Sequence, residues 1–415
     1  MILIFRHYES TGSAPLSESI LRFAKAYIRS QLTHQSFSSM KTALYAFRGL
    51  DTAMELLGIK SVCDCDSSAF DKALEPLAPS SANVIGPQLG LIARFMEENG
   101  LCRYPVGMWK YHRRGKSTFG RVGREFDERR RKGLPDPTAL DALAQAYRLA
   151  AAPKDVVITS LAAIMCAAPE RINEVLVLPS NCEVEPTSSN GKTYLGLRWA
   201  GSKGFNDHVK LMLPGMADVV REALAKIRNE TAEARRMAFW YESNPNTLYL
   251  PKSLEHLRRS EFITADDLGK LLGLSHESAN KSNIGRWVKA AGIPVTPIVL
   301  KPGSPATHLV KFADFERHMI GLLPRGFPIY DVQTGLRYSD ALLTIPYRLF
   351  TVRDPSKGCL CMFEKLKYHH FGNSLGQNGV AGSATVFQRV GIDPDRKFKI
   401  TSHQFRHWLN TLAQG

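Results

Sequence analysis

The sequence lacks the features of a secreted or membrane-spanning protein. It has no apolar run of membrane-spanning length, and its apolar start, residues 1–7, is too short for a signal peptide. Its seven cysteines are odd in number and scattered, which argues against a disulfide framework and for a reducing compartment. Two C-x-C pairs, Cys63/Cys65 and Cys359/Cys361, lack the spacing of a zinc site. We therefore predict a cytoplasmic protein with free thiols and no membrane partner.

Acidic residues are scarce relative to basic ones. The 415 residues include 54 lysines and arginines but only 39 aspartates and glutamates, which gives a formal net charge of +15. Such an excess favours a polyanionic partner, because each phosphate that a cation neutralises releases condensed counterions. A protein that is merely basic is the alternative, since charge alone does not identify a ligand. A chain of this length, with 44% apolar residues, is expected to form two or three globular domains.

Residues 1–112 are predicted to form a small helical domain. Apolar residues recur at helical spacing over residues 21–28 and again over residues 40–57, where Gly58 is expected to end the helix. A third helix is predicted over residues 87–99, with a proline in its first turn. Strand-like alternation of any length is missing from this part of the sequence.

A basic, glycine-punctuated stretch follows, and we predict a linker over residues 113–136. Residues 110–132 contain ten lysines and arginines against three acids. This charge suits the stretch to lie along a DNA backbone, although a solvated connector without a ligand has the same composition. The candidate DNA-binding residues are Lys110, Arg113, Arg114, Lys116, Arg121 and Arg124.

Residues 137–415 are predicted to form a second, larger domain that begins with helices. Asp136 or Thr138 is expected to cap the first helix. A more apolar helix follows over residues 155–167, and its composition predicts burial. A short helix should then open at Pro169, because proline is favoured in a first helical turn.

A β-hairpin is predicted next, from residues 193–199 and 208–213 joined by a polar turn. Apolar residues alternate along the second strand at Val209, Leu211 and Leu213, and we expect them to form its buried side. The chain as a whole is therefore assigned to the mainly α class with a small antiparallel β-sheet (α+β).

A helix predicted over residues 216–228 leads into a mixed, less periodic region, about residues 229–395. Within it, residues 262–294 have the outline of a helix-turn-helix. Thr264 is placed to cap the first helix and Gly273 to end it. Plain helical hairpins share this outline, so the segment contacts DNA, contacts another protomer or only braces the fold.

Three short motifs, taken together and in order, suggest phosphate chemistry. Arg171 and Arg406 come from different elements and can clamp the oxygens of one phosphodiester. Glu174 lies one turn from Arg171 and can hydrogen-bond its guanidinium or only neutralise it. Lys203, expected at the hairpin tip, can deliver a proton to a leaving 5′ oxygen, and His403 can bind the phosphate or accept a proton. Each motif alone is weak, because each occurs often by chance.

In this order the motifs resemble those of the tyrosine recombinases, the phage-integrase family. APERINEVLVL matches the segment of the family's first arginine, AGSKGFNDHVKLML that of the hairpin lysine, and TSHQFRHWLNTLA the H-x-x-R motif. The resemblance implies a helical core-binding domain and a catalytic domain around double-stranded DNA, and a tetramer during recombination. It also implies strand cleavage through a 3′-phosphotyrosine link with neither cofactor nor metal. The site residues that it implies are Arg171, Lys203, His403 and Arg406, supported by Glu174 and His407.

Two features depart from the family pattern. The distance between the hairpin and the H-x-x-R motif is longer than usual, which predicts an insertion over about residues 229–395. No tyrosine follows Arg406, so the sequence shows a phosphate-binding part without its attacking group. Tyr330, Tyr347 and Tyr368 precede the motif, which is the wrong order for the family's nucleophile.

The leading hypothesis is a site-specific recombinase or integrase of a mobile element, truncated before its nucleophile, which binds DNA without cleaving it. The alternative is a natural non-catalytic DNA-binding regulator derived from the integrase fold. A metal-dependent nuclease is a third interpretation, with His369-His370 and Asp393/Asp395 as the nearest candidate ligands, but neither pair has a convincing partner set.

Overall fold

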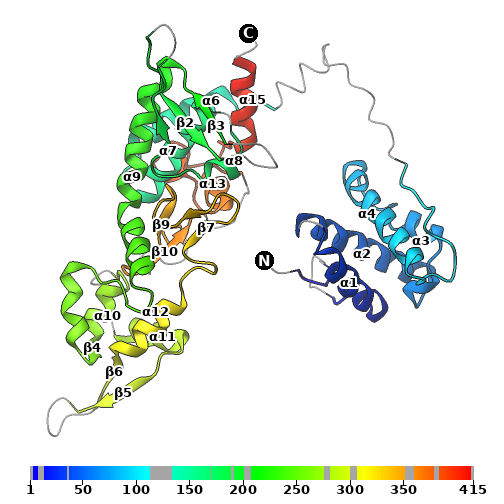
Figure 1. Cartoon of the computed structure of the whole chain (residues 1–415), viewed down its shortest axis with the longest axis horizontal. Coiled ribbons are helices and arrows are strands. Elements are labelled where there is room, and N and C mark those ends of the chain that lie inside the picture. The colour runs from blue at the N-terminus through cyan, green and yellow to red at the C-terminus, as the bar shows by residue number, and fades with distance from the viewer. Residues whose placement is uncertain are drawn as a thin grey trace. The chain divides into compact units, whose positions relative to one another are not determined.

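The computed structural model describes residues 3–7, 14–34, 37–112, 133–168, 170–187, 191–200, 207–274, 281–299, 306–350, 359–377 and 383–412. The chain divides into two compact units, Met1–Gly123 and Arg124–Gly415 (Figure 1). Helices predominate in the described residues and the strands form small antiparallel sheets, which confirms the predicted class. None of the helices described there is both long and apolar enough to traverse a bilayer.

The first unit is helical around an aromatic core. The ring centroid of Tyr27 lies 5.5 Å from that of Phe47 and 5.0 Å from that of Phe95, both edge to face. The second helix ends as predicted at Gly58, which has a positive φ of 69°. The elements of this unit are α1 Glu18–Gln31, α2 Phe37–Leu57, η1 Val62–Asp64, α3 Ser67–Lys72 and α4 Pro79–Glu98.

The helix predicted to begin at Pro87 begins earlier, at Pro79. Pro79 occupies the first helical turn, where its missing N–H has no intrahelical partner to lose, and Pro87 lies inside α4. Just before Pro87 the helix meets the ring of Tyr111, and a Cβ at Gly86 would lie 2.3 Å from Tyr111 Cγ. The predicted start was wrong because both prolines suit a helix start and the sequence does not say which one is used.

The second unit has two hydrophobic cores that share one long helix, α9 Pro214–Ser243. Figure 1 shows α9 running from the elements around α6 and α7 to those around α10 and α12. We call the elements on the first core the proximal body. They are α6 Pro137–Leu149, α7 Pro153–Ala167, α8 Ile172–Val175, β1 Glu183–Val184, β2 Gly196–Trp199, β3 His208–Leu211, α13 Tyr368–Ser374, α14 Val386–Arg389 and α15 Ser402–Leu412.

The distal body surrounds the second core at the other end of α9. Between the two cores lies a ribbon of β9 Thr344–Pro346 and β10 Phe363–Lys365, with Ile345 in the first core and Phe363 in the second. The elements of the distal body are η2 Lys252–Arg259, β4 Phe262–Ile263, α10 Ala265–Leu271, α11 Lys281–Ala291, β5 Val295–Ile298, β6 Thr307–Lys311, α12 Phe312–Gly321, β7 Ile329–Asp331 and β8 Leu336–Arg337.

Several predicted helices of the second unit are present. The carboxylate of Asp136 accepts the backbone N–H of Thr138 and caps α6. α7 is mostly buried, as its composition predicts. Within residues 262–294 both predicted helices form, and Thr264 Oγ1 accepts the backbone N–H of Asp267 over 3.1 Å at the start of α10.

α9 is longer than the helix predicted over residues 216–228. It continues to Ser243, because residues 229–243 are rich in Ala, Arg, Glu and Met, which favour helix. Its buried side belongs to the first core as far as Ile227 and to the second core from Ala234 onwards. The stretch 229–395 contributes to both bodies, because Ile345 and Phe371 belong to the first core and Ala234 belongs to the second.

The β2–β3 hairpin confirms the predicted pairing but not the predicted buried side. Val209, Leu211 and Leu213 are 47%, 52% and 61% exposed, so the expectation for them was wrong. Lys210 pairs across the hairpin with the buried Leu197, and directly opposed residues share a face of the sheet. The buried carboxylate of Glu170, just before α8, accepts a hydrogen bond from Lys210. The alternation of apolar and polar residues along the strand cannot reveal this contact. β1, which pairs with β2, was not predicted.

Candidate functional site

α8 begins beside Arg171, the first of the predicted phosphate-binding residues. The backbone N–H of Arg171 donates to Glu174 Oε2 over 2.8 Å, and its guanidinium Nη1 donates to Glu174 Oε1 over 3.0 Å. Glu174 is buried, whereas the Arg171 side chain is 45% exposed. One buried carboxylate thus holds both the start of the helix and one edge of the guanidinium. Glu174 therefore hydrogen-bonds the guanidinium, which is the first of the two roles predicted for it. Pro169, the expected start of this helix, lies outside the described residues.

A second buried carboxylate, Glu170, joins this helix start to the hairpin. Lys210 Nζ on β3 donates to Glu170 Oε1 over 2.6 Å, and the His208 Nε2 atom lies 3.3 Å from the same oxygen. This cluster could not be predicted from the sequence, because the partners are about forty residues apart and no local spacing links them. Glu170, the neighbour of Arg171 in the sequence, therefore links β3 to the start of α8.

The predicted hairpin lysine, Lys203, lies outside the described residues. The last paired residues on either side of it are Trp199 and His208, and Trp199 is fully buried. The turn end of the paired strands is therefore anchored in the proximal core. Lys210 is the hairpin lysine whose contacts the structure describes.

α15 carries the H-x-x-R motif and is anchored by Phe405. Phe405 is fully buried, with its ring centroid 6.3 Å from that of Phe371. At the helix start, the N–H of Thr401 donates to Gln404 Oε1 over 2.8 Å, and the N–H of Gln404 donates to Thr401 Oγ1 over 3.3 Å, which is a capping box. The Gln404 amide also donates to the Leu134 carbonyl over 3.0 Å, so the helix start is tied to the chain before α6.

His403 and His407 lie on the side of α15 opposite Phe405, with Arg406 beside them. Both histidines are exposed, and their ring centroids are 4.5 Å apart at a right angle. Partial burial and the charges of His403 and Arg406 lower the pKa of His407 below its ordinary value. This face therefore offers imidazole and guanidinium donors to an anion, and a neutral His407 can also accept a proton.

The two arginine-bearing helices rest on one scaffold. Val175, next to Glu174, and Phe405, next to Arg406, both belong to the core of the proximal body. α15 also packs against α7, the helix that precedes α8 along the chain. Motifs that lie more than 200 residues apart in the sequence are thus supported by the same set of buried side chains.

The three tyrosines before the motif differ in accessibility. Tyr330 is buried, its hydroxyl donates to the Leu176 carbonyl over 3.0 Å, and burial raises its pKa well above the ordinary value. Tyr347 is half-buried, with the guanidinium of Arg348 5.2 Å from its ring centroid. Tyr368 opens α13 and is 62% exposed. Tyr330 therefore ties β7 to the end of α8, and Tyr368 is the accessible hydroxyl of the three.

The residues considered as metal ligands have other contacts. The ring of His370 stacks on that of Phe350 with 4.9 Å between centroids, and burial with the charges of its neighbours lowers its pKa to about 4. Asp393 is buried and accepts the backbone N–H of Phe398 over 2.7 Å. Across the described ranges no group of three or more His, Cys, Asp or Glu side chains is placed to hold a metal ion. All seven cysteines are free thiols, as predicted.

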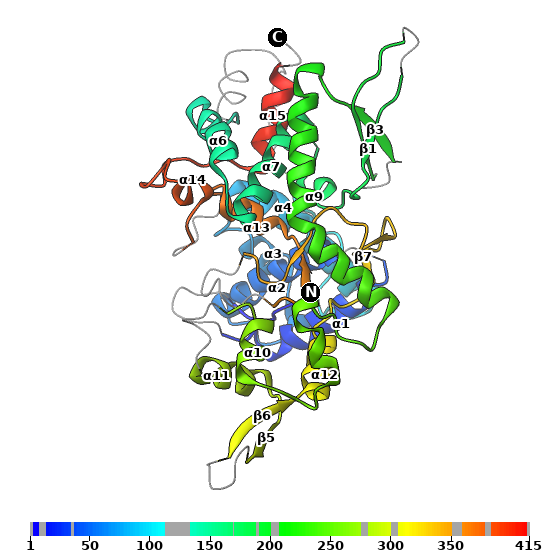
Figure 2. The same ribbon diagram turned by 90° about the vertical axis from the view of Figure 1, so that its left-hand side faces the viewer.

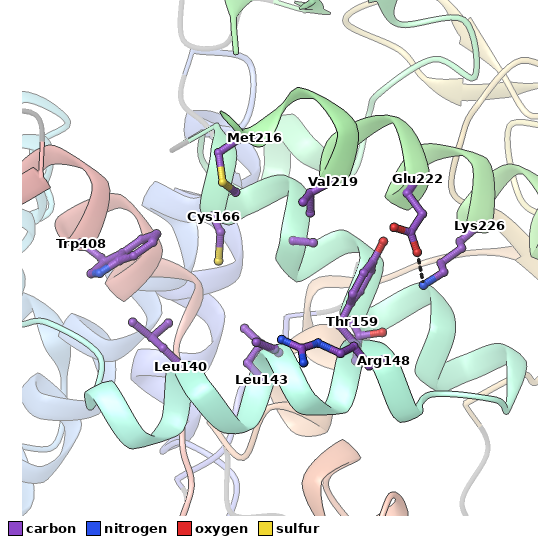
Figure 3. A pocket seen from close by; sticks show the side chains of 13 residues that line it. Leu140, Leu143, Arg148, Thr159, Cys166, Met216, Val219, Glu222, Lys226 and Trp408 are labelled. Atoms are coloured by element: carbon purple, nitrogen blue, oxygen red, sulfur yellow. Dashed lines mark ion pairs between the residues drawn. The ribbon is translucent and has the colours of Figure 1, made fainter. Parts of the chain in front are cut away.

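An apolar pocket of about 600 Å³ lies between α6, α7 and α9, with Trp408 of α15 at its edge (Figure 3). Lys226 pairs with Glu222 over 2.8 Å, and its Nζ lies 3.8 Å from the Tyr147 ring centroid. None of the predicted site residues lines this pocket. Because it holds none of those residues and its walls are mostly apolar, we do not assign it to the candidate site.

Of the predicted DNA-binding residues before α6, Lys110 lies in the described part of the chain, where it is exposed. The others lie outside the described residues and are Arg113, Arg114, Lys116, Arg121 and Arg124.

No protein-family model and no curated protein matches this chain. The resemblance to tyrosine recombinases therefore rests on the sequence motifs alone.

Proposed function

We propose that the chain binds double-stranded DNA and that α8, the β2–β3 hairpin and α15 form the phosphate-binding part of a tyrosine-recombinase site. The observation that carries this proposal is the pairing of a half-exposed Arg171 with a buried Glu174. A guanidinium held along one edge loses little further freedom when its open edge binds a phosphate, which favours a bidentate contact.

Each motif has a role in this proposal. Arg171 and Arg406 bind the non-bridging oxygens, where negative charge grows on a five-coordinate phosphorus. His403 hydrogen-bonds the same phosphate or accepts the proton of the attacking group, and His407 supports it. Lys203 delivers a proton to the leaving 5′ oxygen. The net charge of +15 supplies the long-range attraction to the duplex.

The wider context follows from the resemblance. The proposed reaction is site-specific recombination of a mobile element in the cytoplasm, through a tetramer on DNA and a 3′-phosphotyrosine link. It needs no cofactor, because the energy of the broken phosphodiester is kept in the covalent link. The helices of the first unit, with Lys110 and the basic residues after it, are proposed to contact the duplex as well.

Arginine-to-lysine variants test the phosphate site. Lysine keeps the charge of Arg171 or Arg406 but cannot make a bidentate contact, so Arg171→Lys and Arg406→Lys should each weaken duplex binding roughly tenfold. Fluorescence anisotropy with a labelled duplex measures this. Arg317→Lys is the matched control, because Arg317 lies on α12 with its side chain 77% exposed. Wild-type affinity in both site variants would remove the site assignment.

A nicked suicide substrate tests the attacking group. Residues 407–415 contain no tyrosine, and the exposed Tyr368 precedes the motif, so we expect no covalent adduct after denaturation. An adduct that disappears in Tyr368→Phe would instead make Tyr368 the nucleophile. A non-catalytic regulator would also bind DNA without forming an adduct. Strand transfer by a tyrosine supplied in trans would separate the recombinase from the regulator.

A further inference from the structure

The distal body contains a module, residues 252–311, with the element order of a winged helix-turn-helix. A helical turn η2 leads through β4 to the helix pair α10 and α11, and the hairpin β5–β6 follows. The sheet has the strand order β4-β6-β5, and both pairs are antiparallel. Figures 1 and 2 show the β5–β6 hairpin projecting from the end of the distal body near α11. The strand before the helix pair and the hairpin after it distinguish this module from a plain helical hairpin.

The inner side of α11 is fixed by the module's own core. Ile284 and Val288 are each 5% exposed and belong to the second hydrophobic core, as does Leu268 of α10. The ring of Trp287 lies 6.1 Å, between centroids, from that of Phe315 on α12. α11 is therefore held rigidly from one side, as a helix that reads DNA has to be.

The outer side of α11 is polar, small and basic. Ser282, Gly285, Arg286 and Lys289 are exposed, and their spacing of three and four residues puts them on one face. Residues 281–291 include no Asp or Glu. Within the described ranges Lys289 has no carboxylate partner, and Arg286 donates to the amide oxygen of Asn283 rather than to an acid.

The β5–β6 hairpin adds exposed polar side chains next to α11. His308 and Lys311 on β6 are exposed. By contrast, Lys270 on α10 pairs with Asp267 over 3.3 Å. Within the described ranges, lysines and arginines without a carboxylate partner therefore lie on α11 and at the end of the hairpin, the two parts of such a module that approach nucleic acid.

We infer that residues 252–311 bind duplex DNA, with α11 in the major groove and the β5–β6 hairpin against the adjacent backbone. The small Ser282 and Gly285 allow close approach, while Arg286 and Lys289 reach guanine edges or phosphates. This inference rests on the proposed function in taking DNA as the partner. It adds a second contact, separate from Arg171 and Arg406, that is able to recognise sequence.

A protein partner is the other occupant to consider for this face. The outer side of α11 has no large apolar residue, and lysine is depleted in protein interfaces, whereas anchors such as tyrosine and tryptophan are enriched. The composition therefore favours a polyanion.

The double variant Arg286→Ala/Lys289→Ala tests the inference in the full chain. Its matched control is Arg236→Ala/Arg317→Ala, which removes the same charge from exposed positions of α9 and α12. Duplex affinity is measured by anisotropy over a series of salt concentrations, and thermal melting checks that both variants fold. Two lost phosphate contacts should reduce the slope of log K against log salt by about 1.8, and the control should keep the wild-type slope. Selection from random duplexes should give a consensus for the wild type and the control but not for the double variant.

The outcomes separate this inference from the proposed function. An unchanged slope and an unchanged consensus in the double variant overturn the inference, while loss of affinity in Arg171→Lys still supports the phosphate site. A double variant that loses self-association but binds DNA normally makes α11 a protein contact and also overturns the inference. No binding of any duplex by the wild type at low salt overturns both proposals.

Discussion

The candidate phosphate site and the outer face of α11 hold their cations in opposite ways. In the proximal body, Arg171 and Lys210 each meet a buried carboxylate, Glu174 or Glu170. On the outer face of α11 in the distal body, the cations have no acid on their own helix. Cations fixed by buried acids suit a site that must orient one phosphate, whereas cations without acids suit a surface that follows a backbone or reads base edges. We therefore expect that removing a buried charged partner in the proximal body disturbs folding far more than removing the partner of an exposed cation in the distal body.

The largest effect is expected from Asp155→Ala. Arg389 Nε on α14 donates to Asp155 Oδ1 on α7 over 2.7 Å, and the side chains are 19% and 5% exposed. Removing the acid leaves a largely buried guanidinium unpaired, so the free energy of unfolding should fall by about 3–5 kcal/mol. Urea denaturation measures the change. Asp314→Ala in the distal body, whose partner Arg317 is 77% exposed, should change it by less than about 1 kcal/mol. Equal losses of unfolding free energy in Asp155→Ala and Asp314→Ala would contradict this expectation.

A smaller effect is expected from Glu174→Ala. This change removes the acceptor of the Arg171 backbone N–H as well as the partner of its guanidinium, and should cost about 2 kcal/mol of unfolding free energy. Glu174→Gln keeps an acceptor for the N–H and should cost about half as much. Both variants free the guanidinium, so both should also weaken duplex binding. A stable Glu174→Ala protein with wild-type affinity contradicts the role given to Glu174.

Acid should destabilise the proximal body through His370. Burial, His369 and Lys367 lower the pKa of His370 from 6.5 to about 4, so the folded state binds fewer protons than the unfolded chain between these values. The free energy of unfolding should therefore fall as the pH drops from about 6.5 to about 4. Urea midpoints across this range should depend less on pH in His370→Gln than in the wild type. His308→Gln on the exposed hairpin of the distal body is the control and should follow the wild type.

The smallest effect is expected from Lys289→Ala. Its side chain is exposed on α11 without a carboxylate partner in the described ranges, so the free energy of unfolding should change by less than about 0.5 kcal/mol. Lys210→Ala is the proximal counterpart. It leaves the buried Glu170 without its closest cation and should cost about 1–3 kcal/mol. A destabilisation by Lys289→Ala as large as that by Lys210→Ala would show that α11 is part of a structural contact.

Features set by neighbouring residues could be predicted from the sequence. The cap at Asp136, the cap at Thr264 and the helix end at Gly58 each depend on one side chain or one backbone angle, and all three are present. The contact between Arg171 and Glu174 also follows from a spacing of three residues.

Features set by distant residues could not be predicted. The buried side of β3 depends on Glu170, about forty residues away, and the apolar alternation of Val209, Leu211 and Leu213 indicates the other side. The strand order β4-β6-β5 depends on pairing across the helix pair, for which the sequence carries no local signal. A shared core beneath α8 and α15 likewise becomes visible only in three dimensions.

Hydrogen exchange of the chain with and without a duplex is the most direct test of the phosphate site. Backbone amides of α8 and α15 should exchange more slowly when DNA is bound, because the duplex would hold Arg171 and Arg406 on both helices. Peptides from α12 should exchange at the same rate in both states. Slower exchange elsewhere in the chain, with α8 and α15 unchanged, would contradict the proposed site.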